Sequence, residues 1–500
     1  MSLWWRHAFA RTRHAPGKKY KVSYHELNQE VYKLIQARDF DAAITAAQQC
    51  AACAEEKFGA EHPTTATARQ NVSVLLKKVG RFEEAAEQLQ KSLKIREATF
   101  GEDHITVAQT LHNLGELARL RGNFEESLSH YQRAFKSKEN NYRFDKQMQL
   151  SVAATLSNMG EVLRILGRLE EAHKVLYKGL RIREMELPEL DLDIAISCEA
   201  IGVLEQQLGH LEKAQELYER SLGIRQRLLG EGHEDCFNAL HNLAEVAFQN
   251  GDDKKAETQC RKVLDLREKR HGPEHPEVAT SMVLLGNILK YQGRYEEAMK
   301  MLETCLQVRE KVLGLEHTDV ATVLNNLGVV YKLLGFKPEA EAHLERCLAI
   351  RRKKLGADHV DVADTILNLG TLMIEETERE DDAEQFLMES LSVHRKHYGE
   401  KSHFIRKSSN NVAEMLRRQG MHDDALPIYK DCEDISLTSF KGDSTLATLL
   451  HNKAQVLVEM QAFSGAEPLH KRALKMREEL LGAKHPLVAV SHESLGKMFV

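Results

Sequence analysis

A small residue recurs about every 42 residues along almost the whole 500-residue chain. Successive steps lie between 41 and 45 residues, and the residue is alanine at every position but one, where it is serine. The series is Ala42, Ala85, Ser127, Ala172, Ala214, Ala256, Ala298, Ala340, Ala383, Ala425 and Ala466. A fixed period of this length is the signature of a repeat array, so we do not expect several separate globular domains.

Each repeat contains two segments whose apolar residues fall at helical spacing. Residues 319–359 are representative: Gly335 separates the two segments, and Gly356 follows the second. Glycine at these places is typical of a helix that ends in a left-handed turn. The pattern therefore predicts a helix–turn–helix unit in every repeat.

A second row of small residues runs through the first helix of each repeat. It comprises Ser73, Gly115, Gly160, Gly202, Ala244, Gly286, Gly328, Gly370, Ala413, Ala454 and Gly496. Glycine inside a helix costs about 1 kcal/mol relative to alanine, so the row indicates close helix crossings. One repeat cannot bury its apolar face alone, and stacking predicts an all-α, superhelical solenoid with an inner groove.

The boundaries follow from the period. We expect about eleven repeats and about 23 helices, with the repeats over residues 24–486. A basic amphipathic segment, residues 1–23, precedes them, and a terminal capping helix, residues 487–500, covers the last repeat. Irregular packing is expected around residues 137–147, where the step is 45, and at residues 375–382, where acidic residues replace the usual glycine.

One stretch carries a family resemblance. LNNLGVVY at residues 324–331, with Gly335 and then EA at residues 339–340, resembles the tetratricopeptide repeat. The 42-residue period, closed by IRRKKLGADH at residues 350–359, is similar to the long repeats of kinesin light chains. The resemblance implies a tetratricopeptide-like solenoid that binds other proteins. It also implies that an asparagine of the first helix points into the groove and holds a peptide backbone.

Asparagine occurs two residues before the second small-residue mark in eight repeats. These residues are Asn71, Asn113, Asn158, Asn242, Asn326, Asn368, Asn411 and Asn452. Asparagine is a mediocre helix former, whereas its amide offers donors and an acceptor to any extended backbone. We interpret the row as a peptide-binding groove; the alternative is that each asparagine bonds within its own repeat.

Basic residues stand six positions beyond the asparagine row in six repeats. They are Lys77, Arg119, Arg164, Lys290, Lys332 and Arg417. This row predicts an inner surface that is more positive than the outside and prefers acidic partner segments. Glu116, Glu161, Glu245 and Glu414 share the same face and are expected to neutralise part of the charge.

Periodic histidines follow a unit-closing glycine by three residues. They are His62, His104, His233, His275, His317, His359 and His485. Zinc ligands converge to about 2 Å from one ion, whereas neighbouring repeats are roughly 10–20 Å apart. We therefore predict no metal site, and expect the histidines to order the loop and the start of the next helix.

Two further periodic rows are interpreted as structural. The arginines are Arg96, Arg183, Arg225, Arg267, Arg309, Arg351 and Arg477. With glutamates close by, they predict salt bridges on the surfaces of the second helices. Cys305, Cys347 and Cys432 share a position that holds Ser, Ala or Gly in other repeats, which indicates packing rather than disulfides. Cys50 and Cys53 form a CxxC without a second pair, and the cysteine usage favours a reducing compartment.

Several functional classes lack their motifs. The chain contains no phosphate-binding loop, G-x-S-x-G or H-E-x-x-H, so we predict neither an enzyme nor a cofactor. No apolar run approaches the length of a membrane span. Outside the basic N-terminal segment, 63 basic residues stand against 75 acidic ones, which disfavours nucleic-acid binding.

The N-terminal segment differs from the rest of the chain. Trp4, Trp5 and Phe9 fall on one side of a helix and the basic residues on the other, with no acidic residue before Glu26. An arginine-rich, acid-free amphipathic segment is typical of a mitochondrial presequence. The alternatives are a basic tail on a cytoplasmic protein, or a small anchor to a membrane or a partner.

Together these patterns predict a scaffold or adaptor that holds an extended, acidic segment of another protein. The alternative is a structural subunit built permanently into a large, mitochondrial assembly. An RNA-binding helical-repeat protein is a third possibility, which the acidic repeats disfavour. No small-molecule substrate is predicted.

Overall fold

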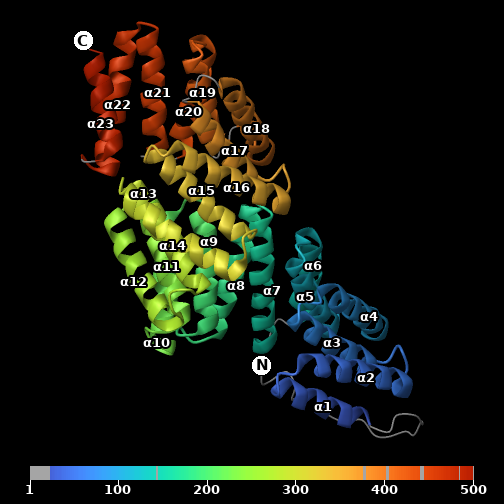
Figure 1. The fold of residues 1–500 in the computed structure, drawn as a ribbon. Helices are drawn as coiled ribbons and strands as arrows, with labels where there is room; N and C mark the ends of the chain where they lie inside the picture. Colours follow the sequence, from blue (N-terminus) through green and yellow to red (C-terminus); the bar gives the residue numbers. More distant parts are fainter. Residues whose placement is uncertain are drawn as a thin grey trace. The chain divides into compact units, whose positions relative to one another are not determined.

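The computed structural model describes residues 23–141, 145–374, 379–400, 402, 405–439, 444–483 and 485–498. These residues form 23 helices and no strand, which confirms the all-α prediction (Figure 1). The first helix begins at Tyr24, as the period predicts. The predicted presequence lies outside the described residues, except for Ser23.

Odd-numbered helices are the first helices of the repeats, and even-numbered helices are the second. The first helices are α1 (Tyr24–Gln36), α3 (Pro63–Lys78), α5 (Ile105–Leu120), α7 (Lys146–Ile165), α9 (Leu192–Gln207), α11 (Glu234–Gln249), α13 (Pro276–Tyr291), α15 (Thr318–Leu333), α17 (Val360–Met373), α19 (Arg406–Arg418), α21 (Ser444–Glu459) and α23 (Pro486–Lys497). The second helices are α2 (Phe40–Phe58), α4 (Phe82–Phe100), α6 (Phe124–Asn141), α8 (Leu169–Glu186), α10 (Leu211–Leu229), α12 (Asp253–His271), α14 (Tyr295–Leu313), α16 (Lys337–Leu355), α18 (Glu380–Tyr398), α20 (His422–Ser439) and α22 (Phe463–Leu481).

The turn between repeats is built from the closing glycine and the periodic histidine. Gly101 ends α4 with a φ of 83°, a left-handed conformation that favours glycine. His104 then caps α5, because its Nδ1 accepts the backbone N–H of Thr106 at 3.3 Å. All seven periodic histidines cap the next first helix in this way. The prediction that they order the loop is therefore confirmed.

Six of the seven glycines inside the first helices mark close crossings, as predicted, whereas a Cβ added to the seventh, Gly496, would meet nothing within 4 Å. A Cβ added to Gly160 would lie 2.4 Å from Cγ of Leu176 on the second helix of the same repeat. At Gly328 it would lie 2.5 Å from Cγ of Leu344. Contacts this short are far inside van der Waals distance, so the helix pair requires glycine at these positions.

The chain divides into two compact units, residues 1–231 and 232–500. In the first unit, α1 to α10 stack as five hairpins around apolar clusters, of which two are large. In the second unit, α11 to α22 form six hairpins and α23 packs on α22. The terminal helix α23 thus packs on the second helix of the last repeat, and it starts at Pro486.

The end of the second unit returns to an earlier repeat of the same unit. His485, in the turn before α23, places its Nε2 2.9 Å from the backbone oxygen of Tyr291 at the end of α13. Cδ of Pro486 would lie 2.8 Å from a Cβ added to Gly293 in the following turn. Residues 194 positions apart therefore touch, a contact that no periodic pattern predicts.

Both places where irregular packing was expected lie partly outside the described residues. In the first, α6 ends at Asn141 and α7 starts at Lys146, with residues 142–144 not described. In the second, α17 ends at Met373 and α18 starts at Glu380, with residues 375–378 not described. The two predictions therefore remain predictions.

We expect Gly328→Leu to lower the free energy of unfolding by about 1–3 kcal/mol, because the new side chain must displace Leu344. Gly223→Leu is the matched control, since a Cβ at this helical glycine meets nothing within 4 Å. Urea unfolding followed by circular dichroism measures both. Equal destabilisation by the two variants would contradict the close-crossing interpretation.

Candidate functional site

The first helices of successive repeats contact one another within each unit, as α5 does with α7 and α13 with α15. We call the surface formed by the asparagine row and the basic row on these helices the first-helix face. Each asparagine lies two residues before a buried small residue, so helical geometry directs its amide away from the crossing. The exposure of the asparagines decides whether they are available to a ligand.

Four asparagines of the row are half-buried and make no hydrogen bond within the part of the chain that the structure describes. They are Asn71, Asn113, Asn326 and Asn411. Their amides have the availability that a backbone-binding groove requires.

Other members of the row are already engaged by the chain. Asn368 is 7% exposed, and its Nδ2 donates to Oδ1 of Asn325 in the preceding repeat at 2.9 Å. Asn452 makes the equivalent bond to Asn410 at 3.4 Å. Asn158 lies 3.4 Å from Nε2 of His112, and Asn242 also has an interaction within the chain. The bonds of Asn368, Asn452 and Asn158 join neighbouring repeats. Some asparagines of the row are therefore used within the chain, and others are not.

Carboxylates compensate part of the basic row. Nζ of Lys77 lies 2.7 Å from Glu116 of the next first helix. Arg164 pairs with Glu161 on its own helix at 2.6 Å. Arg417 pairs with Glu414 at 2.7 Å and also with Glu459 of the next first helix. The expected neutralisation by Glu116, Glu161 and Glu414 therefore occurs.

The other three bases are placed differently. Arg119 lies beside the hydroxyl of Tyr131. Lys332 donates to the backbone oxygen of Thr371 at 2.6 Å. Lys290 donates to Asn287 at 3.2 Å, and burial, reinforced by Lys407, lowers its pKa to about 8. Neither Arg119 nor Lys290 has a carboxylate partner among the described residues, so both retain a positive charge for a ligand.

The arginine row is structural, but its predicted position on the surface is wrong. All seven arginines are buried, with exposed fractions of 3–8%. Nη1 of Arg351 donates to the backbone oxygen of Asp361 and to Oγ1 of Thr365 in the next first helix, both at 2.8 Å. Arg267 and Arg477 repeat this geometry with Ser281 and Ser491. The guanidinium has five donors, which these neighbours share. Two of the predicted salt bridges are also present, because Arg267 pairs with Glu277 at 2.8 Å and Arg225 pairs with Glu199.

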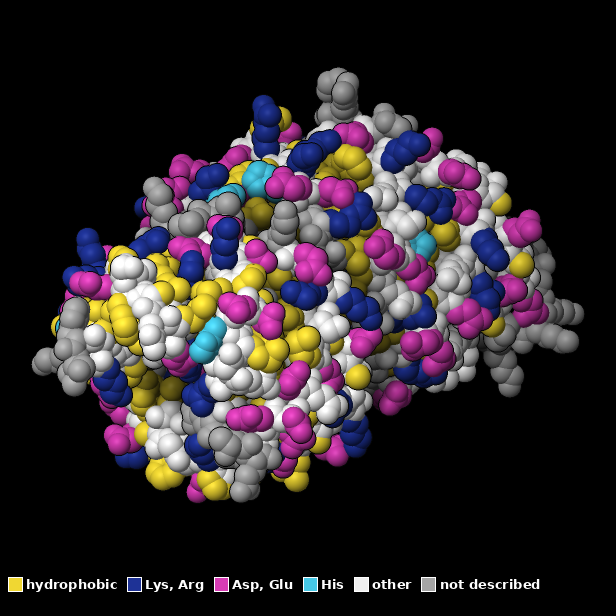
Figure 2. All heavy atoms as spheres, turned by 90° about the horizontal axis from the view of Figure 1, so that it is seen from above, with side chains coloured by type: hydrophobic (Ala, Val, Ile, Leu, Met, Phe, Trp, Pro, Cys, Tyr) yellow, Lys and Arg dark blue, Asp and Glu magenta, His cyan; other side chains and the backbone are white. Residues whose placement is uncertain are grey.

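The cysteines are buried thiols, and the periodic histidines are helix caps. All eight cysteines are free and buried, and burial raises the pKa of the Cys50 thiol to about 12. Over the described ranges no group of His, Cys, Asp and Glu side chains could hold a metal ion. None of the helices described is long and apolar enough to cross a membrane. Acidic and basic side chains alternate over the face drawn in Figure 2, without a broad basic field.

One polar group of interest was missed in the sequence. Lys138 stands 42 residues after Arg96 and therefore occupies the arginine row, but its different residue type left it out of that series. It is 2% exposed and lines a pocket together with Asn113. The departure from the row was the signal that could have identified it.

The geometry defines the class of protein: a helical-repeat scaffold with a polar first-helix face. Models of the tetratricopeptide repeat match most of the chain. The matched residues are 34–98, 75–140, 151–227, 193–256, 235–311, 283–353, 319–396 and 446–487. The chain belongs to the tetratricopeptide repeat family, whose members bind other proteins.

Three solved structures are similar to the chain. A Rap protein complexed with Competence and Sporulation Factor is 14% identical, with a TM-score of 0.50 over 75% of this chain and 99% of that one. BtubC (BKLC) from P. vanneervenii is 22% identical, with a TM-score of 0.40 over 47% and 92%. A putative kinesin light chain of Podosopora anserina is 25% identical, with a TM-score of 0.35 over 40% and 95%. No curated protein is significantly similar to the chain.

Three histidines stand one residue before members of the asparagine row: His451 is buried, whereas His112 and His241 are half-buried. Burial lowers the pKa of His112 and His451 to about 3 and that of His241 to about 4, and a nearby Lys or Arg lowers each further. The unfolded chain binds protons on these rings at about pH 6.5, whereas the folded chain does not. Stability is therefore full above that pH and falls as the pH drops below it.

We expect the free energy of unfolding to fall between pH 7.5 and pH 5, and to fall by about 2 kcal/mol less in His451→Gln. The glutamine keeps a polar side chain in the buried site and cannot be protonated. Urea unfolding at the two pH values measures the difference. An unchanged pH dependence in the variant would contradict the assignment of His451.

Proposed function

We propose that the chain is a protein-interaction scaffold whose first-helix face holds an extended, acidic segment of a partner protein. The observation that carries the proposal is the set of half-buried asparagine amides that have no hydrogen-bond partner among the described residues. An extended segment presents backbone N–H and C=O groups that need partners once they leave water. An asparagine amide supplies a donor and an acceptor to them regardless of the partner's side chains.

Charge supports an acidic partner. Arg119 and Lys290 have no carboxylate partner within the described parts of their units. Burial penalises the ammonium of Lys290, as its lowered pKa indicates, so a carboxylate at this position would relieve that penalty. Charge-assisted hydrogen bonds to carboxylates would then add specificity to the backbone contacts.

Purification of the tagged protein from its own cells at low and high salt tests this proposal against its alternatives. Recovery of acidic proteins that is lost at high salt supports the scaffold, because exposed charge contacts are screened. Stoichiometric recovery that resists salt would favour a permanent assembly subunit instead. Recovery of RNA would contradict both.

We expect Asn326→Ala to weaken partner recovery while leaving the free energy of unfolding within about 0.5 kcal/mol of the wild type. Asn326 is half-buried on α15, where its amide has no bond to replace. Gln307→Ala is the matched control, since Gln307 is an exposed amide on the second helix α14. Quantitative pull-down and urea unfolding distinguish the outcomes; unfolding of Asn326→Ala would indicate an internal role for the amide.

We also propose that residues 1–23 direct the protein to mitochondria. The support is the sequence pattern alone: basic residues opposite Trp4, Trp5 and Phe9, with no acid before Glu26. A positively charged helix is drawn by a negative-inside membrane potential worth about 2.3 kcal/mol per charge per 100 mV.

A fluorescent reporter fused to residues 1–23 should enter mitochondria, as judged by microscopy and protease protection. Replacement of Arg6, Arg11 and Arg13 by glutamate should abolish import, because it reverses the charge. A reporter that stays in the cytosol, or one imported regardless of these changes, would leave the segment as a basic tail. The proposed partner binding does not depend on this result.

A further inference from the structure

Repeat 3 departs from the arginine row in two linked ways. Lys138 of α6 replaces the arginine, and the step to the next repeat is 45 instead of 42. Arg96 in repeat 2 bonds to the backbone oxygen 10 residues on and to the hydroxyl 14 residues on. Lys138 bonds to Ser151 O and Thr155 Oγ1, which are 13 and 17 residues on. The extra three residues account for both shifts, so Lys138 is the structural equivalent of the arginines.

The replacement leaves space where a guanidinium would lie. Nη2 of Arg96 reaches Thr67, and Nη2 of Arg267 reaches Asn238, each 29 residues earlier. The equivalent residue in repeat 3 is Gln109, which lines a pocket of about 300 Å³ instead of meeting a second nitrogen. This volume is at the lower end of the range for small-ligand sites.

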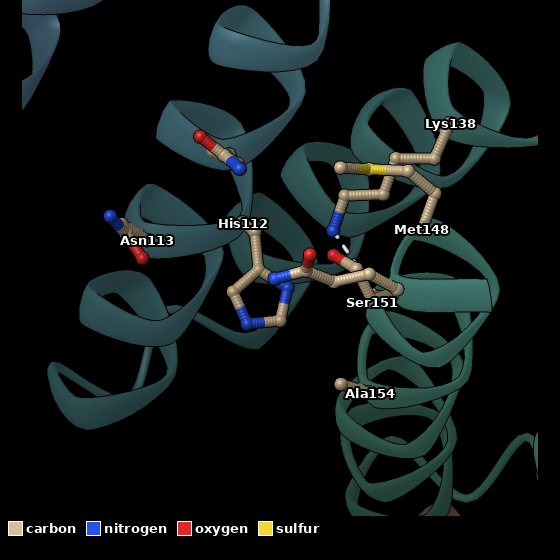
Figure 3. A pocket seen from close by; sticks show the side chains of 8 residues that line it. His112, Asn113, Lys138, Met148, Ser151 and Ala154 are labelled. Carbon is tan, nitrogen blue, oxygen red and sulfur yellow. Dashed lines mark hydrogen bonds between the residues drawn. The ribbon is translucent and has the colours of Figure 1, made fainter. Parts of the chain in front are cut away.

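Three helices of the first unit form the pocket walls. Its lining comprises Gln109, His112, Asn113, Lys138, Gln147, Met148, Ser151 and Ala154, from α5, α6 and α7. Figure 3 shows the amine of Lys138 beside Ser151, with the Met148 side chain next to it and the imidazole of His112 reaching in from α5. None of the lining residues that the structure describes is acidic, and several are amides or hydroxyls that can donate hydrogen bonds.

The ammonium of Lys138 is buried without a countercharge. Its bonds to Ser151 O at 3.3 Å and Thr155 Oγ1 at 2.8 Å use two of its three donors. It has no carboxylate partner among the described residues, and burial lowers its pKa to about 8. A nearby carboxylate stabilises a buried cation of this kind, whereas burial of the cation without a carboxylate is unfavourable.

The hydrogen bonds around Lys138 show that neither Thr155 nor His112 supplies a negative charge. Thr155 Oγ1 donates to Ser151 O at 2.9 Å, so its contacts with Lys138 and with Nδ1 of His112, at 3.1 Å, require it to accept from both. His112 therefore carries its proton on Nδ1 and is neutral, in keeping with a pKa of about 3. Asn158 Nδ2 then donates to the free Nε2 at 3.4 Å.

We propose that this pocket binds one carboxylate of an acidic side chain in the partner segment, with Lys138 as its ion-pair partner and the surrounding amides as donors. The proposal rests on the proposed function, because the acidic side chain comes from the segment held on the first-helix face. Asn113 links the two sites, since it belongs to the asparagine row and also lines the pocket. A backbone held by Asn113 would place its next acidic side chain within reach of Lys138.

Met148 provides a reporter that needs no partner protein. Its side chain lines the pocket, and a ¹³C-methyl label on the 14 methionines, assigned by Met148→Leu, makes its signal visible. The probe is N-acetyl-glutamate α-amide, which presents one acidic side chain. Its matched neutral control is N-acetyl-glutamine α-amide. We expect the Met148 signal to move on addition of the glutamate probe and to stay in place with the glutamine control.

Two variants test the role of the ammonium. Lys138→Met should weaken the glutamate response at least roughly tenfold, because it removes the charge. Lys138→Arg keeps the charge and restores the residue of the arginine row, but its second nitrogen would occupy the space beside Gln109 and should weaken the response. Circular dichroism checks that both variants fold. A wild-type response in either variant, or an equal response to both probes, would overturn the pocket assignment.

The source of the carboxylate is tested separately. Lys138→Arg should reduce partner recovery from cells at low salt, as the acidic side chain loses its pocket. If partner recovery is unchanged in this variant while the glutamate probe still moves the Met148 signal of the wild type, the occupant of the pocket is not a side chain of the partner. Failure of the proposed function would instead appear as loss of any partner from the wild-type protein, which leaves the Met148 titration unaffected.

Discussion

The structure depends on the buried arginines that seven of the eleven second helices carry at the contact with the following repeat. Arg96, Arg267, Arg351 and Arg477 each donate to a backbone oxygen and a hydroxyl on the next first helix. A charge buried in this way is costly unless its donors are satisfied, so the bonds form only when the neighbouring repeat is correctly placed. Apolar packing drives the stacking, but it tolerates sliding. The directional guanidinium bonds specify the register between repeats.

The same arginine orients the first-helix face. The residue 26 positions before it lies on the first helix of its own repeat and faces the guanidinium, as Gln70 and Ser157 do. That residue immediately precedes the asparagine row, so the next position is turned by about 100° toward the first-helix face. The contact between the preceding residue and the arginine therefore fixes the direction of each asparagine side chain, although the asparagine itself does not make that contact. A row of amides with a common direction is what an extended backbone requires.

Much of the fold could be predicted from the sequence, because its determinants are local and periodic. The period predicts the helix pairs, the glycines mark the crossings, and the histidines predict the caps, since each acts within a few residues or within one repeat. The burial of the arginines could not be predicted, because the nearby glutamates suggested surface ion pairs equally well. Nor could the sequence distinguish Asn326, which is available, from Asn368, which Asn325 engages. That difference depends on the residue facing it from another repeat. The contact between His485 and Tyr291 joins residues with no shared pattern, so only the folded second unit reveals it.

Periodic residues and departures from the period have different meanings in this chain. A residue that recurs in most repeats meets a demand common to all of them, namely stacking, capping or register. A ligand, by contrast, meets particular repeats, and its determinants need not recur. Lys138 illustrates the distinction, because it retains the two bonds that hold the next repeat and gives up the nitrogen that would fill the space beside Gln109. The register between the repeats is preserved with fewer hydrogen-bond donors. The space that a guanidinium would occupy stays open, and a positive charge lies there beside an amide of the first-helix face. A substitution that affected only the stacking of the repeats would leave neither the pocket nor a positive charge without a carboxylate partner.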